Sequence, residues 1–316
     1  MFEVFKTTLT PTLLLFLCML IGYLLNKTKR LPSNAAIALS KLETYVLVPA
    51  LIINTFMQYC TVDSLKENAT SLGFSVLLVA CGVGLAYLLS GFFVKSGYSK
   101  NMYKYAFAFG NYIFMGNAVV PALFGQQALY QYLLFTLPLY IVGYTWGVSI
   151  MIPKQAGVKN NAFKSLLNPV VIAIVVGMAL GLLDFGPHLP AFFTGAVSKL
   201  SACMGPVAML LTGFVVGDYP IGAILKNKKV YVATLLRLFV IPAAYIALLW
   251  VLGADRQVML LSLFSYAMPL GLNTVIFPAT YGGETSTGAA MATISHPLSV
   301  VTIPLVYALF CVIFPA

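Results

Sequence analysis

The chain has 316 residues, of which 60% are hydrophobic and 8% are charged, and its mean hydropathy is +0.94. Soluble domains carry about 25% charged residues, so this composition excludes a soluble enzyme or binding module and indicates a polytopic membrane protein. The formal net charge of +10 does not point to nucleic acid, because the basic residues are confined to short loops between apolar runs.

Apolar runs recur along the whole chain. A helix that crosses a membrane needs about 20 predominantly apolar residues. We expect ten such spans and therefore an all-α polytopic membrane protein. The expected spans cover residues 9–25, 36–58, 70–94, 105–124, 131–152, 166–183, 202–217, 230–252, 258–280 and 287–313.

Basic residues collect in alternate loops, which the positive-inside rule assigns to the cytoplasm. The other loops, such as the one with Asp63, Lys66 and Glu67, have no excess of basic residues. Both ends of the chain are then expected outside, and the lysines need no role beyond orientation and contact with anionic lipid. The basic loops contain Lys27, Lys29 and Arg30; Lys95, Lys100 and Lys104; Lys154, Lys159 and Lys164; and Lys226, Lys228 and Lys229.

The sequence contains an internal repeat. The segment PALFG at 121–125 recurs as PATYG at 278–282, a shift of 157 positions, and Pro49 recurs as Pro206 at the same shift. We therefore expect two five-span halves, residues 1–153 and 166–316, joined by a short cytoplasmic linker at 154–165. An odd number of spans in each half makes the two halves inverted, as in many secondary transporters.

The fourth and ninth spans are interrupted by Gly and Asn, and we expect both to be broken helices. Pro121, Pro278 and Pro269 are the expected helix breakers, because proline removes a helical hydrogen bond. An Asn amide is costly to leave unpaired in hydrocarbon. A matched pair of broken spans indicates a transporter's binding site near the bilayer midplane.

The start of a half-helix presents free N–H groups and partial positive charge, which suit a carboxylate. The alternative for the asparagines is hydrogen bonding between helices with no ligand. The residues that we expect at the substrate site are Asn111, Gly116, Asn117, Gly271, Asn273 and Thr274.

Four ionisable residues within or beside the spans are candidates for coupling or gating. Glu43 and Arg237 lie at similar depth and could form an ion pair, with Asp218 as a competing partner, or could snorkel to the interface. His296 lies near the middle of the tenth span. It could carry a proton, or be a neutral histidine bonded to a carbonyl.

The motif NYIFMG at 111–116, followed by Phe124-Gly125, resembles the fourth-span signature of the auxin efflux carrier family. The segment MPLGLNTVIF at 268–277 is similar to the ninth-span pattern of that family, in its bacterial malonate and malate permeases and in plant PIN-FORMED auxin transporters. Arg237 with Pro242, and TIPL at 302–305, also fit. One departure is Ala118, where the family often has proline.

This resemblance implies an elevator-type transporter of small organic anions in the plasma membrane, the inner membrane of a bacterium. Spans one, two, six and seven would form a scaffold and a homodimer surface, and spans three to five and eight to ten would form the transport domain. The crossing fourth and ninth helices would hold the substrate. The coupling ion remains open between proton, sodium and none.

The alternative function is a transporter-like receptor that binds an organic acid or a sterol without turnover. An enzyme is not expected, because HExxH, paired-Asp and GxSxG motifs are missing, so no catalytic residue is assigned. We expect no metal or other cofactor, because the five cysteines are scattered: Cys18, Cys60, Cys81, Cys203 and Cys311.

Overall fold

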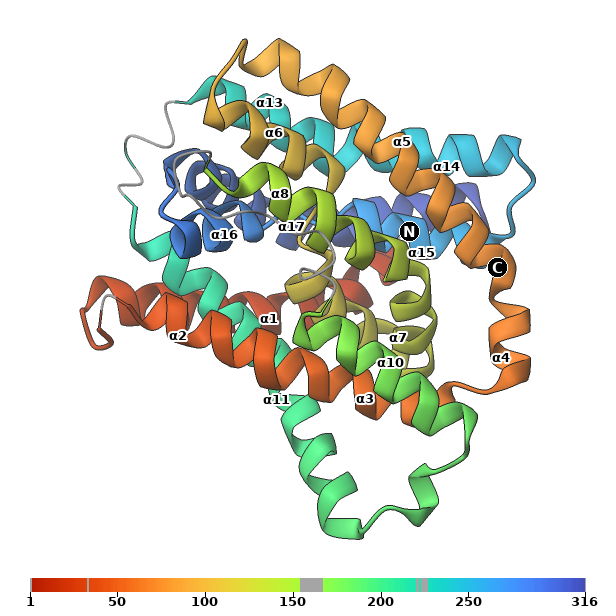
Figure 1. Cartoon of the computed structure of the whole chain (residues 1–316). Helices are drawn as coiled ribbons and strands as arrows, with labels where there is room; N and C mark the ends of the chain where they lie inside the picture. Colours follow the sequence, from red (N-terminus) through yellow and green to blue (C-terminus); the bar gives the residue numbers. More distant parts are fainter. Residues whose placement is uncertain (1, 33, 154–166, 220–221, 223–226, 316) are drawn as a thin grey trace.

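The computed structural model describes residues 2–32, 34–153, 167–219, 222 and 227–315. These residues are almost entirely helical, and no strand occurs among them (Figure 1). The predicted all-α class is therefore confirmed. The predicted linker at 154–165 lies outside the described residues, as do Lys154, Lys159, Lys164 and Lys226.

The described residues of the first half of the chain form eight α-helices and three π-helical turns. The helices are α1 (Phe2–Lys27), α2 (Ala35–Leu42), α3 (Val48–Tyr59), α4 (Val62–Glu67), α5 (Ala69–Phe93), α6 (Tyr98–Ala108), α7 (Asn117–Val142) and α8 (Val148–Met151). The π-helical turns are η1 (Glu43–Leu47), η2 (Tyr112–Gly116) and η3 (Gly143–Gly147).

The second half has the same character within its described residues. Its α-helices are α10 (Pro169–Leu182), α11 (Ala191–Gly217), α13 (Lys228–Leu235), α14 (Ile241–Val251), α15 (Arg256–Tyr266), α16 (Asn273–Tyr281) and α17 (Ser286–Ile313). A 3₁₀ turn, η5 (Gly186–His188), follows α10, and the π-helical turn η6 (Leu236–Val240) joins α13 to α14.

Seven helical stretches of the described chain are long and apolar enough to cross a membrane. The ten expected spans stay a prediction. The difference arises at three places: α10 has only 14 residues, and the fourth and ninth spans are each interrupted. The seven stretches are 2–27, 35–59, 69–93, 112–151, 191–217, 228–251 and 286–313.

The 40-residue stretch 112–151 is not one straight helix. Gly125 has φ 82° and ψ −176°, which places a non-helical residue inside α7. The chain bends there because only glycine adopts this conformation readily. The bend divides the stretch where the sequence predicts the end of the fourth span and the start of the fifth.

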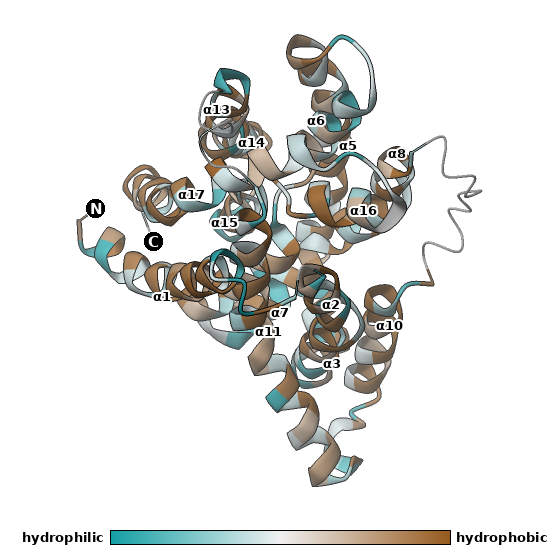
Figure 2. Ribbon diagram, turned by 90° about the vertical axis from the view of Figure 1, so that its left-hand side faces the viewer, coloured by the Kyte–Doolittle hydropathy of each residue, from teal (hydrophilic) through white to brown (hydrophobic). Residues whose placement is uncertain are grey.

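The helices form two layers (Figures 1 and 2). In one layer α1 packs along α11 and α10 packs along α3, while in the other α5 packs on α6 and α14 on α15. A β-carbon on Gly22 of α1 or Gly213 of α11 would overlap a backbone carbonyl of the facing helix, and Gly181 of α10 has the same relation to α3. Small residues allow such close helix packing in membranes.

The outer faces of these helices are apolar, as the hydropathy colouring of Figure 2 shows. Hydrophobic side chains on α1, α10 and α11, and at the residue that follows α10, are among the exposed ones. Contiguous exposed apolar surface of this kind is uncommon on soluble monomers and suits contact with lipid. Examples are Leu14, Leu17, Val175, Leu183 and Phe192.

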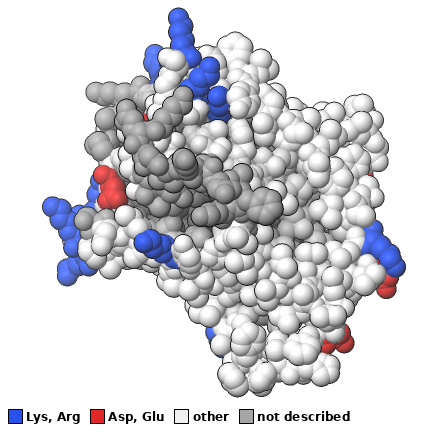
Figure 3. Space-filling view, viewed as in Figure 1, with Lys and Arg blue, Asp and Glu red and all other residues white. Residues whose placement is uncertain are grey.

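Lys and Arg gather at one end of the molecule, on the left and upper left of Figure 3. Two hydrogen bonds join the basic loops there: Lys229 Nζ donates to the Phe93 carbonyl (2.7 Å) and Lys27 Nζ to the Tyr219 carbonyl (3.5 Å). Which side of the membrane this end faces stays a prediction.

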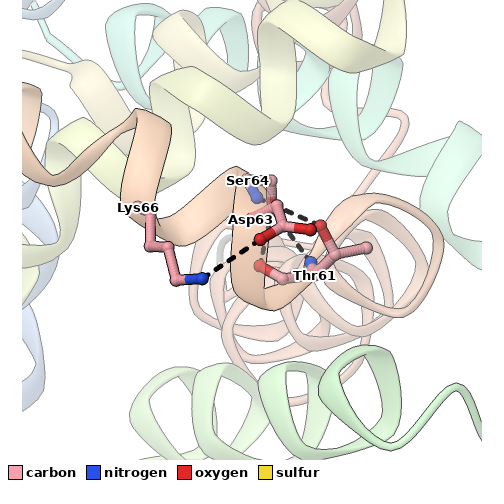
Figure 4. Close-up of polar contacts among 4 residues, drawn as sticks. All are labelled: Thr61, Asp63, Ser64 and Lys66. Carbon is pink, nitrogen blue, oxygen red and sulfur yellow. Dashed lines mark hydrogen bonds and ion pairs between the residues drawn. The ribbon is translucent and has the colours of Figure 1, made fainter.

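The helix α4 lies in one of the loops without an excess of basic residues. Thr61 and Ser64 cap its start reciprocally: the Ser64 N–H donates to Thr61 Oγ1 (3.1 Å) and the Thr61 N–H to Ser64 Oγ (2.9 Å) (Figure 4). Lys66 pairs with Asp63 at 3.2 Å, a surface contact of little energetic weight. Ser64 Oγ also bonds Tyr130 OH (2.7 Å), which fastens the loop to α7.

Every described residue with positive φ has a counterpart near the repeat shift. The six residues form the pairs Gly125 and Gly282, Gly97 and Gly253, and Lys29 and Asp184. Their separations in the sequence are 157, 156 and 155 positions. Backbone with positive φ is typical of bends and ends of helices, so the two halves place such residues at corresponding positions of the chain.

Candidate functional site

The two interrupted spans contact each other inside the protein. After α6 the chain is extended at Phe109 (φ −126°, ψ 119°), and Gly110 forms an isolated antiparallel β-bridge with Leu270, which follows α15. The Asn111 N–H donates to the Pro269 carbonyl at 2.8 Å. We call the non-helical residues 109–111 and 267–272 the two breaks.

Glycines allow the breaks to approach closely. A β-carbon on Gly271 would lie 3.1 Å from the Phe109 carbonyl oxygen, and one on Gly110 would lie 2.9 Å from the Met268 carbonyl oxygen. Both distances are too short for a normal carbon–oxygen contact. The close approach of the breaks therefore requires glycine at 271, whereas Gly116 packs against the ring of Tyr132.

The structure corrects the assignment of the helix breakers. Pro121 lies inside α7 and Pro278 inside α16, so neither proline interrupts its helix. Pro269 does lie in the second break, where its carbonyl accepts the hydrogen bond from Asn111. Both helices accommodate an internal proline, so the presence of proline in an apolar span does not locate a break.

Asn111 and His296, which the sequence places in separate spans, are hydrogen bonded. The Asn111 amide nitrogen lies 2.8 Å from His296 Nε2, and His296 Nδ1 lies 3.0 Å from the Ala292 carbonyl oxygen. An amide NH₂ only donates, so Nε2 is the acceptor and Nδ1 carries the proton. This is the pattern of a neutral imidazole.

Asn117 and Asn273 occupy matching positions, as the first residues of α7 and α16. They lie 156 positions apart in the sequence. Each donates its amide to a tyrosine hydroxyl: Asn117 to Tyr140 (2.9 Å) and Asn273 to Tyr105 (3.0 Å). Thr274 Oγ1 is used locally, because it donates to the Gly271 carbonyl (2.8 Å).

Aromatic rings connect the two asparagine–tyrosine pairs. Tyr140 stacks on Tyr144 with ring centroids 6.5 Å apart, Tyr144 lies 6.3 Å from Phe277, and Phe277 lies 5.9 Å from Tyr105. Tyr112 packs edge-on against Tyr140 at 5.2 Å. The sequence analysis missed these tyrosines, because a tyrosine in an apolar span carries no signal that separates a packing role from a polar one.

The site offers hydrogen-bond donors to a ligand. In accepting from Asn117 and Asn273, the hydroxyls of Tyr140 and Tyr105 keep their own hydrogens for another acceptor. The buried hydroxyl of Tyr112 has no hydrogen-bond partner. The positive ends of the helices that begin after the breaks lie in the same region. Such an arrangement can bind a group that only accepts hydrogen bonds.

Glu43, Arg237 and Asp218 are not brought together. The carboxylate of Glu43 is buried and neither of its oxygens has a hydrogen-bond partner. Arg237 donates from Nη1 to the Phe107 carbonyl in α6 (2.9 Å) and from Nε to the Met268 carbonyl in the second break (3.4 Å). Asp218 accepts from the amide of Asn26 (2.6 Å). The ion pair considered for Glu43 and Arg237 is therefore not formed.

A comparison with protein families matches the model described as "Membrane transport protein" to residues 7–163 and 158–307. Together these two stretches cover nearly the whole chain and both breaks. No curated protein matches the chain. In the described residues no group of three or more His, Cys, Asp and Glu side chains could hold a metal ion.

Proposed function

The chain belongs to the membrane transport protein family, that of the auxin efflux carriers, and we propose that it is a secondary active transporter of small organic anions. Members of this family are transporters rather than enzymes. The substrate site in this proposal is the region where the breaks meet, with Asn111, Asn117 and Asn273 as donors. The coupling ion, whether proton or sodium or none, is left open.

The donor-rich chemistry of the breaks supports a carboxylate as the substrate's binding group. A carboxylate accepts up to about four hydrogen bonds and donates none, which complements tyrosine hydroxyls and asparagine amides. Among the buried residues described, Glu43 and Arg237 are the ones with charged side chains. A small anion of low charge suits a site with so few fixed charges.

The two-layer packing supports an elevator-type mechanism. We propose that α1, α3, α10 and α11 form the scaffold, and that the layer with both breaks moves against it. A narrow cavity of about 50 Å³ lies between α2, α11 and α16, and Val275 and Ile276 line it. These residues follow Asn273 and Thr274 directly, so this boundary is where the site would open.

The paired left-handed residues support two inverted five-span repeats within a ten-span protein. The proposal also includes a homodimer formed through the scaffold, location in the plasma membrane, which is the inner membrane in a bacterium, and both termini outside. These features follow from the family resemblance and from the positive-inside rule.

The observation that carries the proposal is the contact between two amide-bearing breaks. The test measures uptake of malonate, malate and indole-3-acetate by proteoliposomes that contain the protein. We expect the wild type to transport at least one of these anions. Asn111→Ala and Asn273→Ala should each reduce that flux by about 100-fold, since removing a donor from a buried site costs about 1–3 kcal/mol and two partners are affected.

The matched control is Asn54→Ala. Asn54 is also buried in an apolar helix and hydrogen bonded, to Gln58 at 3.1 Å, but it belongs to α3 of the scaffold. We expect this variant to keep most of the flux. Wild-type flux in both site variants, with equal amounts of protein reconstituted, would refute the site.

A further inference from the structure

Arg237 is a fully buried cation without a carboxylate partner. It lies in η6, within a stretch long and apolar enough to span the membrane, and its exposed fraction is 0%. The ion pair that the described residues form joins Lys66 to Asp63 at the surface and does not involve Arg237. A buried charge without compensation is strongly unfavourable, so other groups must stabilise the guanidinium.

Those groups are two backbone carbonyls, one shortly before the first break and one within the second. Arg237 Nη1 lies 2.9 Å from the Phe107 oxygen, at the end of α6, and Nε lies 3.4 Å from the Met268 oxygen, just after α15. The ring of Tyr266 lies 5.5 Å from the guanidinium carbon. One side chain therefore contacts the carboxyl ends of both half-helices that lead into the breaks.

The carboxyl end of a helix carries partial negative charge of about half an electron, and its last carbonyls have no helical partner. Two such ends meet beside the proposed anion site, where they would repel the ligand. A guanidinium placed between them cancels this charge. Its planar fork can also donate to two acceptors at a fixed separation, which a lysine ammonium does less well.

Gly110 fits this arrangement. A β-carbon there would collide with Nη2 and would lie 3.0 Å from Nε of Arg237. The missing side chain lets the guanidinium lie directly against the first break. Nη2 itself is buried and has no hydrogen-bond partner.

We propose that Arg237 is a positioning residue that clamps the ends of α6 and α15 together and neutralises them, so that the breaks present a net positive field to an anion. The clamp requires no ligand. The effect on the anion rests on the proposed function.

Hydrogen–deuterium exchange of the full-length protein in nanodiscs tests the clamp without any ligand. In Arg237→Gln we expect the backbone amides of segments 109–116 and 267–276 to exchange about tenfold faster. Without the guanidinium the breaks are held less firmly, and their hydrogen bonds then open more often. Exchange in α5 and α17 should stay unchanged. Arg237→Lys, which keeps the charge but not the fork, should protect at most one of the two segments.

Arg256→Gln is the matched control. Arg256 also donates Nε to a backbone carbonyl, that of Phe314 at 2.9 Å, and lies over an aromatic ring, that of Phe310 at 5.4 Å, but at the end of α17. Its loss should leave both break segments as in the wild type. The clamp is refuted if Arg237→Gln leaves both segments unchanged or if exchange rises equally throughout the protein.

A second readout addresses the field. The affinity for malonate of the same proteins should fall about tenfold in Arg237→Gln and should be largely kept in Arg237→Lys, since the ammonium retains the charge. Equal losses in both variants would contradict the electrostatic part.

If the wild type bound none of the three anions, the proposed function would fail, while the exchange data would still decide on the clamp. If Arg237→Gln does not fold, Arg237→Lys decides, and identical exchange to wild type in both segments overturns the clamp.

Discussion

The hydrogen bond between Asn111 and His296 determines what the histidine can do. With Nδ1 donating to the Ala292 carbonyl and Nε2 accepting from the amide, both ring nitrogens are occupied and the ring is neutral. To gain a proton, Nε2 would have to lose its contact with the amide nitrogen, since two donors would then face each other. The geometry thus favours a histidine that orients Asn111 over one that shuttles protons.

A substitution at position 296 separates these roles. His296→Gln keeps an acceptor for the Asn111 amide and cannot titrate, so we expect reduced flux with the same relative pH profile between about pH 5 and 8. His296→Leu removes the acceptor and should cost a further 1–3 kcal/mol or so in the bound state. Uptake by proteoliposomes across this pH range is the measurement. A profile that flattens in His296→Gln would establish a proton role.

The asparagines were predictable from the sequence, whereas their partners were not. A polar amide in an apolar span is costly, and the Gly and Asn interruptions shared by the fourth and ninth spans single out Asn111, Asn117 and Asn273. Their bonds to His296, Tyr140 and Tyr105 depend on how distant segments pack. The position of Arg237 shows the same limit: the sequence indicates that a buried arginine needs partners, but backbone carbonyls are available at every residue.

At the scale of elements, glycine and extended backbone mark both breaks, and of the three expected prolines Pro269 alone lies in one of them. The sequence correctly directs attention to the fourth and ninth spans, because both carry Gly and Asn. It also counts Pro121 and Pro278 among the helix breakers, whereas both are tolerated inside α7 and α16. The breaks are set by the pairing of Gly110 with Leu270, which is a tertiary contact.

The bends at Gly125 and Gly282 give a test at this scale. Both have positive φ and open space around a β-carbon, so alanine would be strained by its backbone alone. We expect Gly125→Ala and Gly282→Ala each to destabilise the protein by about 1–2 kcal/mol, seen as a lower apparent Tm in detergent.

Gly73 is the control for these two positions. It also has no atom within 4 Å of a β-carbon, but it lies in the regular helix α5 with an ordinary φ. Gly73→Ala should leave Tm unchanged or raise it, because alanine favours a helix by about 1 kcal/mol over glycine. An equal drop in Tm for all three variants would show that the left-handed backbone is not the cause.

At the scale of the whole molecule, the proposed mechanism requires one layer of helices to move against the other. The two layers touch where Gly205 of α11 faces Ala118 of α7, with a β-carbon separation of 3.3 Å. This is near the usual separation in a disulfide of about 3.8 Å. In a cysteine-free background, a disulfide between cysteines at 205 and 118 should abolish flux, which should return on reduction.

A disulfide within one layer is the matched control. A β-carbon on Gly177 of α10 would lie 3.1 Å from the α-carbon of Ile53 in α3. Cysteines at these two positions should also crosslink, yet flux should persist because both helices belong to the proposed scaffold. Full flux with the 205–118 bridge closed would argue against relative motion of the layers.

Charge placement and helical content at this scale were readable from the sequence, since short basic loops and long apolar runs are local features. The number of crossings was harder to establish. An interrupted span and the 14-residue α10 fall below the length of a continuous membrane helix, although both are apolar.

The guanidinium between the two breaks comes from only one half of the chain. The residue 157 positions before Arg237 is Ala80, whose methyl group offers no comparable charge. A protein built from two identical copies of either half would have two such cations or none. In the proposed elevator mechanism the inward-facing and outward-facing forms would therefore differ in energy, and we expect one of them to predominate at rest even without a gradient.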